Sequence, residues 1–580
     1  MGVEIRLRGN LVKFAILASA TALALTMSAG AVATTPTLAA DDVTGFEQKE
    51  LNAPVASDFS PGGNTATPLL AASIGTQRQS VAFVPTATVV KSFEGISQYD
   101  VASYSRNFVP PDTMGAVGKT QFVEFVNGGF AVFGKNGTVQ VGKSDVSFWA
   151  AAGQTGTNGD SRVLYNKAAD RWIALAFGAS RSDIQIAVSN TSDAAGTWKS
   201  TKFTGFAGGT ADYPTLAMDN NAVYIGTNNF SAAGSFKGTS LNIIPLASLI
   251  NATAPTTTGL VRTTTAYTGY AGLGTPDGGY AIQGVNSTAA TTTGHVESAS
   301  LFYTNLLRYD VTNVGTPGQT IVNATYLDNA VFDSNGAARQ PNAVADAPTA
   351  GSTFTNNNRV IDTSDYRVGS SIYENNGKIY SVRTLTPTGG SFTVVRYDVV
   401  DAATNTLLDE GEIGDASHDY FQGSLSVNAN GQVVIAYNRS GSGADGNISF
   451  LARIFSTDPS GHLTQRGAES LLKVSSVDDY HNGSIHNFVA AGRQRWGDYS
   501  QVTVDPTNSQ QFWVIGQFAK EYNDGVDHPT GTGGSRWGTW ISAIDAGTQV
   551  PEPATWAMML VGFGLVGAAV RRRHNGFASA

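Results

Sequence analysis

The chain has 580 residues and no cysteine. No disulfide can stabilise its fold, and no thiolate is available for a metal or redox site. The sequence also lacks a phosphate loop, a dinucleotide fingerprint and the spaced acidic ligands of an EF-hand. We therefore predict a protein with no cofactor and no resident metal.

Charged residues are scarce too. Asp, Glu, Lys and Arg make up 14% of the chain, against about 25% in an average soluble domain. The formal net charge is −9, which disfavours nucleic acid and anionic membrane surfaces as partners. We predict no nucleic-acid partner.

Glycine, in contrast, is abundant, with 65 residues. Threonine, serine and asparagine are frequent as well, and this composition is typical of many short strands joined by tight turns. The chain is too long for one compact two-layer domain, so its length fits a large all-β ring or two domains.

The N-terminal end has the features of an export signal. Three basic residues precede an apolar stretch over residues 14–27, and Ala31 and Ala33 supply small side chains at the −3 and −1 positions of a cleavage site. This order predicts a secretory signal peptide over residues 1–33. The alternative, a membrane anchor, is disfavoured because the apolar stretch is short for a bilayer. Residues 34–80, rich in Ala, Thr, Pro and Gly, are predicted to be a flexible lead segment.

The C-terminal end has a second signal in three parts. A Pro-Glu-Pro motif stands before an apolar run over residues 554–570, and three arginines follow the run. As a helix the run is about 25 Å long, just enough to cross a hydrocarbon core, and the basic residues would keep its end in the cytoplasm. The flanking residues are Pro551, Glu552, Pro553, Arg571, Arg572 and Arg573.

This order resembles the PEP-CTERM sorting signal of Gram-negative bacteria. The resemblance implies that residues 550–580 are a sorting domain and that an exosortase-type enzyme is a partner. It also implies a transient inner-membrane anchor through residues 554–570, followed by transfer to the cell surface or the extracellular matrix. An ordinary single-span anchor is the alternative, but it leaves the Pro-Glu-Pro motif unexplained.

Residues 81–549 carry a repeated pattern in which an Asp is followed by a strand, a tight turn and a second strand. Clear turns begin at Asn220, Asn430 and Asn508, and Asn tolerates the positive φ that hairpin turns need. The six copies begin at Asp112, Asp160, Asp212, Asp365, Asp419 and Asp498. Third strands are expected over residues 183–190, 305–313, 392–400 and 538–544.

Several neighbouring copies start about 50 residues apart, and repeats of about this length with three or four strands are typical of a β-propeller. A degraded copy at residues 276–286 fits the long gap after Asp212. We predict an all-β chain, a β-propeller with seven blades or, as the alternative, six. A strand near residues 81–90 is expected to pair into the last blade and close the ring. No helical period competes outside the terminal segments.

The Asp-Tyr pairs at the repeat starts admit two interpretations. As structural markers, Asp accepts backbone N–H groups at a turn and Tyr packs between blades. As a binding surface, these positions would converge near a central channel and present carboxylates and aromatic faces to a carbohydrate. The candidate binding residues are Asp112, Asp160, Asp212, Tyr213, Asp365, Tyr366, Asp419, Tyr420, Arg495, Trp496, Asp498 and Tyr499.

The stretch TSDAAGTW, residues 191–198, resembles the Asp-box turn of sialidase-type propellers, with one extra residue after Asp193. The stretches PPDTMGAVG, DYPTLAMD and RWGDYSQVTVDP are similar to segments of secreted bacterial propeller-like proteins without assigned chemistry. Because the Asp box is a structural turn, the resemblance implies a noncatalytic sialidase-like propeller.

A glycan-active hydrolase is the alternative, and it needs an arginine cluster, a nucleophile and an acid. The available residues are Arg162, Arg171, Arg367, Arg493, Arg495, Glu124 and Glu374, and no motif fixes a Tyr-Glu pair among them. His481 and His486, with Asp478 and Asp479 nearby, could gather around a cation, but a flexible polar loop explains them as well, and zinc sites usually have tighter spacing.

The sequence thus favours an exported surface or matrix protein whose propeller binds a glycan, such as an exopolysaccharide, or another protein. It leaves hydrolysis open as the second hypothesis.

Overall fold

The computed structural model describes residues 6–7, 10–11, 88–104, 106, 108–250, 254–266, 280–288, 293–299, 306–316, 318, 320–321, 325–326, 332–333, 337–341, 360–363, 368–478, 480, 494–522 and 535–547. The chain comprises two units, Met1–Val32 and Ala33–Ala580. In the first unit, β1 (Arg6–Leu7) pairs with β2 (Asn10–Leu11) in an antiparallel hairpin. The predicted cleavage site, the lead segment and the sorting segment lie outside the described residues.

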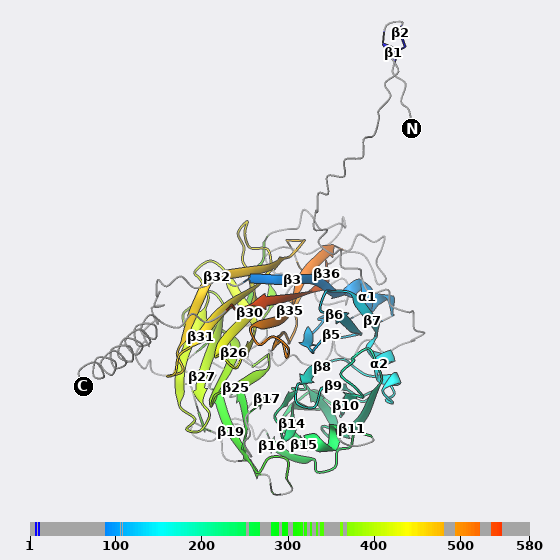
Figure 1. Ribbon diagram of the computed structural model, residues 1–580. Coiled ribbons are helices and arrows are strands. Elements are labelled where there is room, and N and C mark those ends of the chain that lie inside the picture. The colour runs from blue at the N-terminus through cyan, green and yellow to red at the C-terminus, as the bar shows by residue number, and fades with distance from the viewer. Residues whose placement is uncertain are drawn as a thin grey trace, which may run out of the picture. The chain divides into compact units, whose positions relative to one another are not determined.

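The second unit is built from sheets in which most pairings are antiparallel and most strands follow one another in chain order (Figure 1). The first sheet comprises β4 (Met114–Val117), β5 (Gln121–Val126), β6 (Gly129–Gly134) and β7 (Val139–Ser144), and the second comprises β8 (Arg162–Asn166), β9 (Arg171–Phe177), β10 (Asp183–Ser189) and β11 (Trp198–Thr204). The third comprises β12 (Gly209–Asp212), β13 (Ala217–Met218), β14 (Ala222–Ser231), β15 (Phe236–Pro245) and β16 (Val261–Ala266). The fourth comprises β17 (Tyr280–Asn286), β18 (Gly294–Ala299) and β19 (Leu306–Thr312), with β20 (Thr320–Ile321) and β21 (Thr325–Tyr326) beside β19.

Three further sheets continue the series, and a short parallel pairing, with Val285 opposite Ile372, joins the fourth sheet to the fifth. The fifth comprises β25 (Ile372–Asn375), β26 (Lys378–Pro387), β27 (Val394–Asp401) and β28 (Leu407–Ile413), with β22 (Phe332–Asp333) against β26, and the sixth comprises β29 (Asp419–Val427), β30 (Gln432–Ser440), β31 (Ser449–Thr457) and β32 (Leu463–Val474). The seventh comprises β34 (Gln501–Val504), β35 (Gln511–Tyr522), β36 (Ser535–Asp545) and, from the other end of the chain, β3 (Thr88–Ser97). A small additional sheet joins β23 (Ala337–Ala338), β24 (Ile361–Asp362) and β33 (Gln494–Arg495). The prediction of an all-β chain is confirmed, and β17 lies within residues 276–286, where the sequence predicted a degraded copy.

Hairpin turns connect the first and second strands of the sheets where the sequence predicted them. The carboxylate of Asp219 accepts hydrogen bonds from the N–H groups of Asn221 at 2.7 Å and Ala222 at 2.8 Å. Asn428 and Asp505 occupy the same place in the sixth and seventh sheets and likewise accept backbone N–H groups. A short polar side chain that bonds to backbone two residues further on fixes such a turn.

Apolar clusters lie between consecutive sheets. Phe125 of the first sheet and Trp172 of the second belong to one cluster, and further clusters join each later sheet to the next. The seventh sheet also packs against the first, through a cluster that includes Phe122 and Trp513. Because both faces of each sheet are covered, strands such as β5 and β6 are buried at every position, which explains their mostly apolar sequence.

The predicted pairing of an N-terminal strand is observed. β3 lies antiparallel to β36, with Val89 opposite Ile544 and Phe93 opposite Ile541. The strand is described from Thr88 onward, while residues 81–87 of the predicted range lie outside the described residues. Segments from the two ends of the chain therefore share one sheet.

Three short helices occur among the described residues, where the sequence showed no helical period: α1 (Gln98–Ser103), α2 (Asp145–Ala151) and α3 (Leu246–Ile250). Each has at most seven residues, too few to leave a periodic signal. No helix in the described part of the chain is long and apolar enough to cross a membrane, and the predicted span at 554–570 lies outside that part.

Candidate functional site

In several sheets, the first strand is preceded or interrupted by a residue with positive φ. Asp112 has φ 49°, Asp160 and Tyr213 have 52°, and Gln422, within β29, has 53°. Asp tolerates this left-handed conformation, whereas bulky side chains adopt it rarely. At Tyr213 and Gln422 the conformation is therefore held by the surrounding contacts.

Residues from three sheets meet around Arg162, the first residue of β8. Cζ of its guanidinium lies 3.4 Å from the ring centroid of Tyr499 and 5.6 Å from that of Tyr213. The two tyrosine rings are 5.0 Å apart, and Nε of Arg162 donates to the carbonyl of Pro214 at 2.9 Å. Desolvated cation–π contacts of this kind are worth about 2 kcal/mol, so the cluster fastens the second, third and seventh sheets together.

Carboxylates surround this contact. The hydroxyl of Tyr499 donates to Oδ2 of Asp160 at 3.2 Å, and Oδ1 of Asp112 accepts the N–H of Asp498 at 2.8 Å. Asn127 bridges the two Asp residues: its Nδ2 donates to Oδ2 of Asp112 at 2.9 Å and its Oδ1 accepts the N–H of Asp160 at 2.7 Å. We refer to Asp112, Asp160, Arg162, Tyr213 and Tyr499 as the arginine–tyrosine cluster.

The arginine–tyrosine cluster is closed to solvent. Tyr499 is 0% exposed, Arg162 1% and Tyr213 2%. Burial, and then the charge of Asp160, raise the pKa of Tyr499 well above its ordinary value, so the phenol stays protonated and donates its hydrogen bond. A buried neutral phenol under a guanidinium offers no face for a sugar ring to stack on.

Other predicted residues lie outside the cluster. Asp212, beside Tyr213, is partly exposed and faces Arg181 at 3.4 Å. Trp496 is fully buried, and its Nε1 donates to Oδ1 of Asn438 at 3.1 Å. Arg495 belongs to β33, and Asp365 and Tyr366 lie outside the described residues.

The alignment of Asp419-Tyr420 with Asp498-Tyr499 is wrong by two residues. Gln422 is the residue that corresponds to Tyr213 and Tyr499, because each stands six positions before the polar residue of its hairpin turn. A shift in pairing between Phe421 and Ser424 displaces the start of β29. Sequence alignment on Asp-Tyr does not detect such a bulge.

The displaced pair makes contacts of its own. The carboxylate of Asp419 accepts hydrogen bonds from the side chain of Arg339, at 3.0 Å, and from the N–H of Thr393, at 2.9 Å. The ring of Tyr420 packs 5.6 Å from that of Tyr437, and its hydroxyl donates to Oδ2 of Asp415 at 2.9 Å. Tyr420 thereby joins a different polar assembly.

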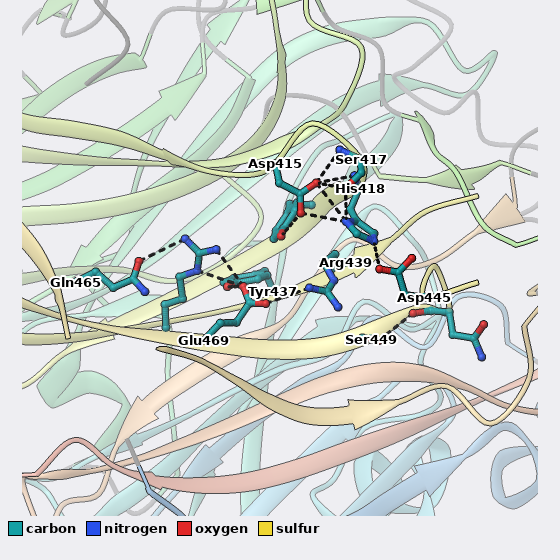
Figure 2. A network of polar contacts seen from close by, with 12 residues as sticks. Asp415, Ser417, His418, Tyr437, Arg439, Asp445, Ser449, Gln465 and Glu469 are labelled. Atoms are coloured by element: carbon teal, nitrogen blue, oxygen red, sulfur yellow. Dashed lines mark hydrogen bonds and ion pairs between the residues drawn. The ribbon is translucent and has the colours of Figure 1, made fainter. Parts of the chain in front are cut away.

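Figure 2 shows this assembly, which spans the sixth sheet and two of its loops. At one end, His418 lies between Asp415, 3.0 Å from Nδ1, and Asp445, 3.2 Å from Nε2. At the other, Glu469 accepts hydrogen bonds from Tyr437, Arg439 and Arg453. We call it the His418–Glu469 network, comprising Asp415, Ser417, His418, Tyr420, Tyr437, Arg439, Asp445, Arg453, Gln465 and Glu469.

The His418–Glu469 network reaches solvent, unlike the arginine–tyrosine cluster. The side chain of Asp445 is 75% exposed, that of Asp415 37% and that of Arg439 24%. Burial alone would raise the pKa of Asp415, but hydrogen bonds from Ser417, Tyr420 and His418 lower it below its ordinary value. The network therefore presents the ionised carboxylate of Asp415 and the side chain of Asp445 at its loop end, and the guanidinium of Arg439 at its other end.

The described residues among those considered for hydrolysis are not brought into one constellation. Glu124 is fully buried, where it accepts the N–H of Ile96 and contacts the hydroxyl of Thr539, and Arg171 donates to the backbone of Asp170. Glu374 is on β25. Arg367, Arg493, Asp479, His481 and His486 lie outside the described residues, and among the residues the structure does describe, no group of three or more acidic, His or Cys side chains is arranged to hold a metal.

Sequence reasoning missed Asn127, Gln422 and most of the His418–Glu469 network. Asn127 stands before two glycines, which is typical of a turn and gives no sign that it bridges Asp112 and Asp160. The predicted turn at residues 191–198 does have the expected role, since Asp193 accepts the N–H of Ala195 at 2.9 Å between β10 and β11.

Comparison with protein families finds the PEP-CTERM protein-sorting motif at residues 549–573. This span contains the Pro-Glu-Pro motif, the apolar run and the three arginines. The sorting motif expected from the sequence is thus supported. No curated protein matches the chain.

Among solved structures, the chain is similar to a protein of unknown function from Dyadobacter fermentans, with 10% identity, 79% of this chain and 100% of that chain covered, and a TM-score of 0.36. It is also similar to an alpha-L-arabinanase of Penicillium chrysogenum, with 11% identity, coverage of 58% and 93%, and a TM-score of 0.29. A third is Drosophila Semaphorin 1b, with 10% identity, coverage of 79% and 87%, and a TM-score of 0.34.

Proposed function

We propose that this chain is an exported protein, sorted by an exosortase-type enzyme to the cell surface or the extracellular matrix, whose all-β body binds a glycan or another protein. The observation that carries the proposal is the sorting motif at residues 549–573. A signal peptide over residues 1–33 would start the export, and the span over 554–570 would hold the chain in the inner membrane until it is processed.

We further propose that the body is a seven-bladed β-propeller. The seven sheets follow one another along the chain, an apolar cluster lies between each and the next, and the seventh packs on the first. First strands of adjacent sheets also contact one another, as β29 does β34 and β34 does β4. A ring closed in this way leaves no long sheet edge exposed between blades.

Binding suits the described residues better than hydrolysis. The buried arginine–tyrosine cluster fills the place where inner strands converge, and its groups are engaged with one another. The His418–Glu469 network instead offers Asp415, Arg439 and Asp445 at the surface. Carboxylates and guanidinium groups pair with the hydroxyl groups of sugars and with polar side chains of proteins, so this network is the proposed contact surface.

Intact-mass measurement of the protein released from its native cells tests the sorting. We expect a mass that lacks residues 1–33 and the segment after about residue 550. A variant with Pro551 and Glu552 replaced by Ala should stay with the membrane at a higher mass, while the matched change Pro506→Ala, in the turn between β34 and β35, should not alter processing. Released protein that still contains residues 554–580 would contradict the proposal.

A further inference from the structure

The joint between β3, β36 and β5 contains a backbone irregularity. The pairing of β3 with β36 shifts between Glu94 and Ser97, which takes Gly95 and Ile96 out of the regular ladder. Residues in such a bulge need other hydrogen-bond partners. The N–H of Ile96 donates to Oε2 of Glu124, from β5, at 2.9 Å.

The carbonyl of Ile96 accepts a hydrogen bond from Thr539 of β36. The Oγ1 atom of Thr539 lies 3.0 Å from that carbonyl oxygen and 2.6 Å from Oε1 of Glu124. A threonine hydroxyl carries a single hydrogen. If that hydrogen goes to the carbonyl of Ile96, the short contact with Glu124 is a hydrogen bond only when the glutamate carries a proton and donates it. Both contacts of the Thr539 hydroxyl are therefore hydrogen bonds when Glu124 is a carboxylic acid, and only one of them is when Glu124 is a carboxylate.

Water has little access to this pair. Glu124 is 0% exposed, and a Cβ on Gly95 would lie 2.2 Å from Oε2 of Glu124 and 2.4 Å from Oγ1 of Thr539. The side chain of Ile96 beside it is also fully buried. A carboxylate in such surroundings would lose its hydration without gaining a cation.

The charged groups facing this joint come from each element packed on it. Asp100 of α1 and Glu94 of β3 are acidic, and Lys520 of β35 pairs with Glu94. Burial raises the pKa of Glu124 to about 8 and that of Asp100 to about 6, although hydrogen bonds partly oppose both shifts.

We propose that protonated Glu124 is a pH-sensitive latch that holds β3 in the seventh sheet and releases it on ionisation. While the acid is protonated, the hydrogen-bond chain from Glu124 through Thr539 to Ile96 is complete. When the proton leaves, a buried charge remains and the hydroxyl can serve only one of its two acceptors. The folded pKa is raised above the unfolded value, so the stabilisation is present below about pH 4.5 and is lost as the pH rises through about 8.

Thiol labelling tests the latch in the full chain, which has no cysteine of its own. Ile96→Cys reports detachment of β3, and Ile435→Cys, at a fully buried position of β30, reports opening elsewhere. The ratio of their labelling rates cancels the ionisation of the thiol itself. It should rise by about tenfold per pH unit between pH 5 and 8 and level off above, as expected for release of one proton.

Glu124→Gln is the decisive second change, because its amide can accept from Ile96 and donate to Thr539 at every pH. In this variant the ratio should stay flat, whereas Asp100→Asn and Glu94→Gln should keep the rise. A ratio that is flat with Glu124 present overturns the proposal, whether or not Glu124→Gln folds. A rise that persists in Glu124→Gln overturns it as well.

Discussion

At the scale of single residues, Arg162 has the most demanding surroundings. A guanidinium is costly to bury unless its charge is compensated. Here the compensation comes from the face of Tyr499, whose hydroxyl in turn donates to Asp160, and from the carbonyl of Pro214. These groups belong to different sheets, so the same contacts that compensate the charge also fix the relative positions of the sheets.

This role leads to a prediction for Tyr499. Tyr499→Ala should lower the free energy of unfolding by about 3–5 kcal/mol, since a buried aromatic is removed and Arg162 loses its stacking partner. Tyr499→Phe keeps the ring and removes one hydrogen bond to Asp160, which should cost about 1–2 kcal/mol. Urea unfolding of the processed protein measures both.

Tyr99→Ala is the matched control, because that ring is 46% exposed and its loss should cost less than about 1 kcal/mol. If Tyr499→Ala lowered the free energy of unfolding as little as Tyr99→Ala, the arginine–tyrosine cluster would not hold the sheets together. A loss of glycan binding without a loss of stability would instead make it a binding surface.

The sequence was enough to predict a structural role for the Asp-Tyr pairs. It was not enough to predict which residues they contact. Asp and Tyr residues in front of strands indicated turns and packing. That Arg162 stacks on Tyr499 depends on two strands more than three hundred residues apart in the chain, and no local pattern encodes that contact. The error at Asp419-Tyr420 has the same origin, because a bulge in β29 changes the register without changing the motif.

At the scale of elements, β3 connects the N-terminal part of the chain to the seventh sheet. Phe93 and Ile96 place their side chains in the apolar cluster between the seventh and first sheets. The N-terminal half of β3 is more exposed, with Val90 45% exposed. Most of its buried side chains therefore lie in the C-terminal half. The sequence indicated that an N-terminal strand would close the last sheet, since the pattern of short apolar strands begins just after the lead segment.

Paired deletions test the importance of β3. A protein without residues 34–80 should melt as the parent does, because the deleted stretch precedes the strand. A protein without residues 34–97 should aggregate or melt at a clearly lower temperature, because β36 then presents an open edge and the cluster loses Phe93 and Ile96. Differential scanning calorimetry with light scattering distinguishes the two. Equal melting temperatures for both deletions would show that β3 is dispensable.

At the scale of the whole molecule, the arginine–tyrosine cluster is buried, whereas the His418–Glu469 network reaches solvent on the sixth sheet. We therefore predict that the processed protein binds polysaccharides without cleaving them. Arg439→Ala combined with Asp445→Ala should weaken binding by about tenfold, since loss of one charge-assisted hydrogen bond costs at least about 1.4 kcal/mol. Lys202→Ala, which removes an exposed cation from β11, should leave affinity unchanged.

A polysaccharide array with a reducing-sugar assay provides the measurement. Release of reducing sugar by the processed protein, abolished by Arg162→Ala in a variant that still folds, would replace binding by hydrolysis. Equal affinity of the Arg439/Asp445 double variant and the parent would move the contact surface away from the His418–Glu469 network.

The position of β36 sets a limit on how the chain can be held during sorting. β36 ends at Asp545 and the Pro-Glu-Pro motif begins at Pro551, and six residues of extended chain reach at most about 21 Å. In the proposed route, the folded body is therefore tethered close against the lipid surface until the sorting enzyme acts. That enzyme must approach its cleavage site through a gap narrower than a small protein domain, so the tether itself restricts which processing enzymes can gain access.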